Sequence, residues 1–121
     1  VRIRNIGTAA TTGTITFRVT NYTPASGLVI AIHPDADVTI GGDTYVFDHN
    51  DFTWTFSGGF IVFKSKVGVS IGASQTKKIG LRITRTGGGK GTITASANIV
   101  NGSGGENNPP NNLLSNTLIK N

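Results

Sequence analysis

Short runs of alternating apolar and polar residues fill most of this chain. Residues 14–19 read Thr-Ile-Thr-Phe-Arg-Val, and residues 52–56 read Phe-Thr-Trp-Thr-Phe. A period of two is typical of a strand with one buried face, so we expect Ile15, Phe17 and Val19 to be buried. Similar short runs, separated by Gly, Asn or Pro, cover residues 1–4, 28–32, 38–40, 45–47, 60–63, 79–84, 93–99 and 114–119. The pattern predicts an all-β fold without helices, an antiparallel β-sandwich of about seven to nine strands.

Composition supports this interpretation and excludes several classes of protein. The chain has 121 residues, which suits a single domain over 1–121, and 17 of them are Thr, whose branched Cβ favours strands. No apolar run approaches the roughly 18–20 residues that cross a bilayer, so we expect no membrane insertion. Cysteine is absent, which excludes a disulfide, a thiolate metal site and a Cys nucleophile.

One low-complexity segment, residues 101–112, is rich in Gly, Asn and Pro. Its composition is also that of a linker. Because it lies between two predicted strands, we interpret it as a structured loop in which Asn side chains bond their own backbone.

Several segments together carry a resemblance to a known family. They are Asn5–Ala10, Gly13–Phe17, Trp54, Ile71–Ser74, Ile79–Ile83, Gly91–Ala97, Gly104–Glu106 and Asn111–Asn112. As a set they resemble the conserved-repeat, Ig-like domain family of bacterial surface and secreted proteins. The resemblance implies an Ig-like sandwich, often repeated in tandem, that serves as a stalk or adhesion scaffold and has no catalytic residues. The family's first strand is longer, so the resemblance implies a truncated first strand here, one that a neighbouring copy could supply.

Charge is unevenly distributed along the chain. The net charge is +5, yet the stretch between Arg18 and Lys64 contains five acids and no base. The rest of the chain contains eleven bases and one acid, Glu106. We hypothesise that the acidic and basic regions of neighbouring copies meet and orient them, in which case high salt weakens the association.

The acids also suggest a calcium site. Asp35, Asp37, Asp48 and Asp51 offer the hard oxygen ligands that Ca²⁺ requires, but their spacing is not that of an EF-hand. Loop Asp residues more often form turns through side-chain to backbone bonds, which is the interpretation we favour. His33 and His49 are the only imidazoles and offer a weak case for a transition-metal site. We therefore expect no cofactor, with calcium as the alternative.

Seven of the nine aromatic residues fall within residues 45–63. If Tyr45, Phe52 and Trp54 faced outward in a row, they would form a platform for sugar rings. Aromatic alternation more often marks a core, and we expect Trp54 to anchor the sandwich from inside.

Two glycine-rich motifs match catalytic or nucleotide-binding patterns only in letters. Gly68–Gly72 fits G-x-S-x-G, but a nucleophile elbow needs a helix after the Ser, and none is predicted. Gly87–Thr92 is similar to the end of a phosphate-binding loop, but Gly91 stands where that loop needs a hydroxyl. We interpret both as turns.

Basic residues alternate with apolar ones on several predicted strands: Arg2, Arg4, Arg18, Lys64 and Arg82. Alternation places them on outer faces, where they protect sheet edges or contact an anionic glycan. No aromatic residue is interleaved with them, so we expect no nucleic-acid binding.

These observations favour a non-catalytic structural or adhesion module of a bacterial cell-surface or secreted protein. Its partners would be neighbouring domains of the same polypeptide, or a cell-surface glycan or protein. The alternative is a carbohydrate-binding module attached to a secreted enzyme. A buried Trp54 favours the first hypothesis and an exposed Trp54 the second.

Overall fold

The computed structural model describes residues 1–21, 27–87, 91–105 and 113–120. Within these ranges the chain is all-β, with eleven strands and two short 3-10 turns. In chain order they are β1 (Arg2–Arg4), β2 (Thr16–Thr20), β3 (Leu28–Ile32), β4 (Asp37–Ile40), β5 (Asp43–Val46), η2 (His49–Asp51), β6 (Phe52–Ser57), β7 (Phe60–Ser65), β8 (Thr76–Lys78), β9 (Leu81–Arg85), β10 (Gly91–Ile99), η3 (Ser103–Gly105) and β11 (Leu113–Lys120). No helix in these ranges is long and apolar enough to cross a membrane.

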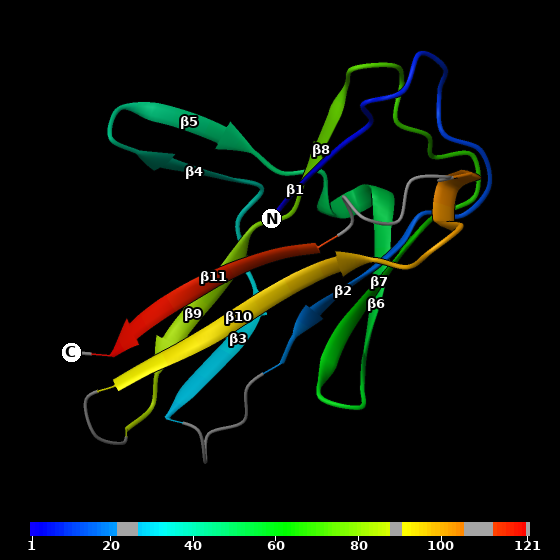
Figure 1. The fold of residues 1–121 in the computed structure, drawn as a ribbon. Coiled ribbons are helices and arrows are strands. Elements are labelled where there is room, and N and C mark those ends of the chain that lie inside the picture. The colour runs from blue at the N-terminus through cyan, green and yellow to red at the C-terminus, as the bar shows by residue number, and fades with distance from the viewer. Residues whose placement is uncertain (22–26, 88–90, 106–112, 121) are drawn as a thin grey trace.

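All strand pairs are antiparallel. The largest sheet has five strands in the order β11-β10-β2-β7-β6, and three two-stranded sheets pair β1 with β8, β3 with β9 and β4 with β5. Figure 1 shows the β4–β5 hairpin extending away from the other sheets. The remaining sheets enclose one core, which is consistent with a β-sandwich, so the predicted fold class is confirmed.

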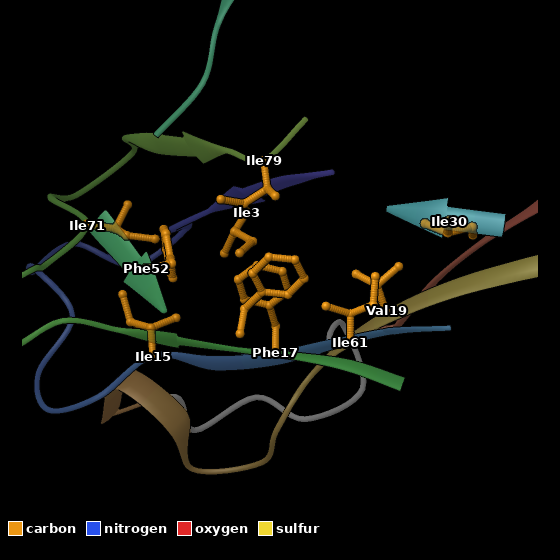
Figure 2. Packing of buried hydrophobic residues seen from close by; sticks show 10 residues of the cluster. Ile3, Ile15, Phe17, Val19, Ile30, Phe52, Ile61, Ile71 and Ile79 are labelled. Atoms are coloured by element: carbon orange, nitrogen blue, oxygen red, sulfur yellow. The ribbon is translucent and has the colours of Figure 1, made fainter. Parts of the chain in front are cut away.

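The core lies between the five-stranded sheet and the two pairs opposite it (Figure 2). From the five-stranded sheet, Phe17 stacks on Phe63 with ring centroids 4.5 Å apart, and Phe52 meets Phe17 edge-on at 5.5 Å. From the other side come Ile3 and Ile30, which lie on β1 and β3. The predicted burial of Ile15, Phe17 and Val19 is confirmed, since none is more than 3% exposed.

The predicted number of strands was too low. Strand β8 consists of Thr76, Lys77 and Lys78, which have no apolar alternation, and it is held by its pairing with β1. The run predicted over residues 79–84 also begins later, at Leu81. Gly80 precedes that strand and lies directly under the Phe47 ring, where an added Cβ would come within 2.4 Å of a ring carbon.

The described part of the 101–112 segment, residues 101–105, forms a turn followed by η3. Gly104 is buried, its N–H donates to the carbonyl of Thr14 at 2.9 Å, and its own carbonyl accepts from Thr12 N–H at 2.8 Å. The Ser103 hydroxyl accepts from the Thr16 N–H. Gly104 has φ +64°, a conformation that favours glycine. Residues 106–112 lie outside the described ranges.

Candidate functional site

The turn before β6 brings two of the four candidate calcium ligands together. The Lys77 ammonium lies 3.1 Å from Asp48 Oδ1 and 2.6 Å from Asp51 Oδ2, so a side-chain cation sits between the two carboxylates. The hydrogen bond to Asp51 raises the pKa of Lys77 above its ordinary value, and that to Asp48 adds to it, against an opposing effect of partial burial. Asp48 also fixes β8, because its Oδ2 accepts the Lys78 N–H at 2.7 Å.

Asp35 and Asp37 lie elsewhere. Asp35 is exposed, and its carboxylate lies 3.8 Å from the Nδ1 atom of His33. Asp37 begins β4 and is exposed as well. Within the described ranges, no three carboxylate or imidazole groups are placed to hold a metal ion. The four acids therefore do not form one calcium cluster, since the fold pairs two of them with Lys77 and places the other two on or beside the hairpin.

Both histidines pack against one phenylalanine. The Phe47 ring lies 5.7 Å from His33 and stacks on His49 at 5.1 Å, measured between centroids. The Nε2 atom of His49 accepts the Gly80 N–H at 2.9 Å, which requires an unprotonated Nε2. Burial lowers the pKa of His49. His49 therefore joins the η2 turn to the segment that enters β9.

The alternative arrangement, in which Tyr45, Phe52 and Trp54 face outward in one row, is not formed. Phe52 is 2% exposed and belongs to the core, whereas Tyr45 is on the projecting hairpin and Trp54 is on β6. The expectation of a buried Trp54 was wrong, because Trp54 is 41% exposed. Its ring centroid is 6.2 Å from that of Phe63, so only one side of the indole reaches the core.

A surface that the sequence did not suggest lies along β6. Phe56, two residues after Trp54 on the same face, is 62% exposed. The residues opposite these two on β7, Phe63 and Ile61, are fully buried on that face. At Trp54 and Phe56 the layer that covers the sheet therefore ends between β7 and β6, although it still covers Phe52 at the start of β6. Strand β6 is also the last strand of its sheet in the described structure. We call the Trp54 and Phe56 side chains, with the outer backbone edge of β6, the open-edge surface.

No sequence signal marked this surface. Exposed edge strands usually contain Lys, Pro or a bulge, which discourage pairing with other chains. Residues 52–57 have no charge and no proline, and their pairing with β7 is continuous. Such a sequence is typical of a strand that is paired along both edges.

The β4–β5 hairpin carries a second group of exposed apolar side chains. Tyr45 lies opposite half-buried Val38, and Ile40 is two residues further along the same face. Ile40 is 63% exposed. A two-stranded hairpin buries little by itself, so this face is only weakly supported from within the domain.

The remaining motifs take up structural positions. In Gly68–Gly72, Ser70 is exposed in the connection between β7 and β8, and the carbonyl of Ile71 accepts from Thr11 N–H at 3.0 Å and Asn5 Nδ2 at 2.8 Å. The strand-turn-helix of a nucleophile elbow is therefore not formed at Ser70. Gly87–Thr92 is only partly described, because residues 88–90 fall outside the described ranges.

The alternating basic residues lie on the surface, as predicted. Arg2, Arg4, Arg18, Lys64 and Arg82 are all exposed. The Arg18 guanidinium lies over the Phe60 ring, 5.8 Å from its centroid, on the outer face of the five-stranded sheet. This face is distinct from the one that holds Trp54.

Comparisons with known proteins add no identification: no family model, no curated protein and no solved structure matches the chain. The resemblance to the conserved-repeat family therefore stays a prediction.

Proposed function

We propose that the chain is a non-catalytic structural and adhesion module, Ig-like in fold, of a bacterial cell-surface or secreted protein. The open-edge surface is the observation that carries the proposal. An exposed aromatic pair beside a strand edge that pairs with no other described strand is a surface suited to contact with another molecule. The partners would be neighbouring domains of the same polypeptide, or a cell-surface glycan or protein.

The contacts of the carboxylate and imidazole side chains beside β6 support a structural role. Asp48 and Asp51 hold Lys77, and His49 accepts from the Gly80 backbone. Each bond joins segments about thirty residues apart in the chain. The side chains of Asp48, Asp51 and His49 therefore form bonds that stabilise the arrangement of the strands.

The terminal strands suit a module that transmits force. Pairing of β1 with β8 extends to Asn5, whose N–H donates to the Gln75 carbonyl at 3.0 Å. Strand β11 pairs with β10 along eight positions, from Gly91↔Lys120 to Asn98↔Leu113. Tension applied at the two ends therefore acts on strands in two different sheets, each held by its own ladder of backbone hydrogen bonds.

Single-molecule pulling tests the structural proposal. An array of identical copies of residues 1–121 should unfold in equal steps, each lengthening the chain by about 40 nm at ~3.6 Å per extended residue. Unfolding without a resolvable force peak, or in smaller unequal steps, would contradict a load-bearing domain.

The alternative, a carbohydrate-binding module of a secreted enzyme, is supported by the half-exposed Trp54. Because Trp54 is the only tryptophan, its emission reports this site alone. Titration with soluble cell-wall and plant polysaccharides distinguishes the proposals. Saturable shifts with plant polysaccharides that are lost in the Phe56→Ala variant would favour the carbohydrate-binding module, whereas the structural proposal expects a shift with cell-surface glycans at most.

A further inference from the structure

We propose that two copies of this chain bind each other through their β6 strands, paired antiparallel about a two-fold axis into one continuous ten-stranded sheet. The inference rests on the proposed adhesion function and deepens it by naming the partner of the open-edge surface as a second copy. Four features of β6 carry it: outer backbone groups that pair with no other strand in the described ranges, self-complementary faces, lack of charge and exposed aromatic area.

The backbone groups at the outer edge of β6 can be assigned from the neighbouring ladders. Ser65 N–H donates to the carbonyl of Ile15, toward β2, and Lys66 N–H donates to the carbonyl of Asp51, toward β6. Backbone groups alternate in direction along an antiparallel strand. In β6, Thr53 and Thr55 therefore face β7, while Trp54 and Phe56 direct their N–H and C=O groups outward. The outward groups belong to the residues whose side chains form the open-edge surface.

Strand β6 is complementary to itself. A two-fold axis perpendicular to the sheet keeps the same face up in both copies, so even-numbered residues lie opposite even-numbered ones. With Thr55 at the axis, Trp54 lies opposite the Phe56 of the other copy, and Thr53 opposite its Ser57. With Trp54 at the axis, the two indoles lie opposite each other. In both registers aromatic side chains meet on one face and hydroxyls meet on the other, and such cross-strand pairs are favourable.

Charge favours a second copy at this edge over the edges of the β1–β8 sheet. Residues 52–57 contain no ionisable side chain, so two β6 strands meet without repulsion between like charges. By contrast, β1 carries Arg2 and Arg4, and β8 carries Lys77 and Lys78. Self-pairing of those strands would bring like charges together.

The exposed area sets the strength of the contact. Trp54 and Phe56 each leave on the order of 100 Å² uncovered, so four aromatic side chains contribute about 400 Å². Stable complexes bury about 1,200–2,000 Å² in total, so this is a weak dimer, with a Kd of roughly 0.1–1 mM. Between two surfaces that each display many copies, weak contacts of this kind add to a strong attachment.

Sedimentation equilibrium between about 10 µM and 1 mM tests the proposal. Wild type should shift from monomer to dimer and stop there, because a two-fold contact closes on itself. Phe56→Pro removes an outward N–H that β7 does not use, together with the aromatic ring, and should weaken association at least tenfold. Phe56→Lys should do so as well and keeps the backbone intact. Val67→Lys is the matched control, because it adds the same charge at a fully exposed residue outside β6, in the connection after β7, and should leave association unchanged.

Amide hydrogen exchange identifies the pairing itself. The amides of Trp54 and Phe56 should become protected as concentration rises, while those of Thr53 and Thr55 are protected throughout. A monomer at 1 mM, or a dimer in which the Trp54 and Phe56 amides stay unprotected, would overturn the proposal. Open-ended assembly that also protects new amides in β11 would overturn it too, because that result shows head-to-tail pairing.

The salt dependence of dimerisation distinguishes strand pairing from association driven by charge. Each copy has a net charge of +5, so screening should leave the β6 dimer unchanged or strengthen it. Dissociation by salt would show that acidic and basic regions make the contact and would refute the strand pairing. Failure of dimerisation leaves the pulling signature of the single module unaffected, so the two proposals fail separately.

Discussion

The aromatic side chains at the two ends of strand β6 lie on the same face of the sheet, but one end is buried and the other is exposed to solvent. At its start, Phe52 is 2% exposed and the preceding turn is fixed by the bonds of Asp48, His49 and Asp51. Two and four residues later, Trp54 and Phe56 are 41% and 62% exposed. Alternation is identical along the whole strand, so it determines the face on which a side chain lies. Burial depends on how far the opposing layer extends over that face.

The sharpest test compares the same truncation at both ends of the strand. Phe52→Ala should lower the free energy of unfolding by about 3–5 kcal/mol, because it leaves a cavity beside Phe17. Phe56→Ala removes the same atoms from a largely solvated site and should cost less than about 1 kcal/mol. Denaturant unfolding measures both. Equal losses would mean that the covering layer extends over Phe56.

The Lys77 contacts at the start of β6 should have the next largest effect. Lys77→Met leaves the Asp48 and Asp51 carboxylates facing each other without a cation, and should destabilise the fold by about 1–2 kcal/mol given their partial exposure. Lys78→Met is the matched control, because it keeps the backbone bond to Asp48 and should cost within about 0.5 kcal/mol. Similar losses in both variants would show that the ion pairs add nothing specific.

His49 should make the free energy of unfolding depend on pH near neutrality. Burial lowers its pKa in the folded state, so the unfolded chain takes up a proton first as pH falls. The contribution of His49 is fully present above the ordinary histidine value of about 6.5 and is lost as pH falls from there toward the folded pKa. Thermal unfolding between pH 7.5 and 5 should show this decline, and His49→Gln should flatten it. A decline that persists in His49→Gln would assign it to other groups.

The smallest effect is expected from calcium. Because the Lys77 ammonium lies between the two carboxylates that converge, adding calcium should leave the unfolding midpoint of the wild type unchanged. A midpoint that rises with calcium concentration would show that the ion displaces Lys77 or binds Asp35 and Asp37, and would restore the calcium hypothesis.

Local pattern was a good guide to the strands and a poor guide to the site. Residues 28–32 form β3 as predicted, and a turn at Gly41 and Gly42 joins β4 to β5. Strand β8 was missed because pairing with β1 holds it, which no local signal records. The convergence of Asp48 and Asp51 on Lys77 spans about thirty residues, and spacing along the chain does not encode such a contact.

The sequence by itself determined the fold class, the faces of the strands and the central core residues. It did so because period-two alternation and β-branched composition act locally, within each strand. Only the tertiary structure decided that β6 lies at the end of its sheet, that Trp54 is half exposed, and that Lys77 separates two carboxylates. Those outcomes depend on which strands become neighbours and where the covering layer ends. Both are set by the packing of the whole domain.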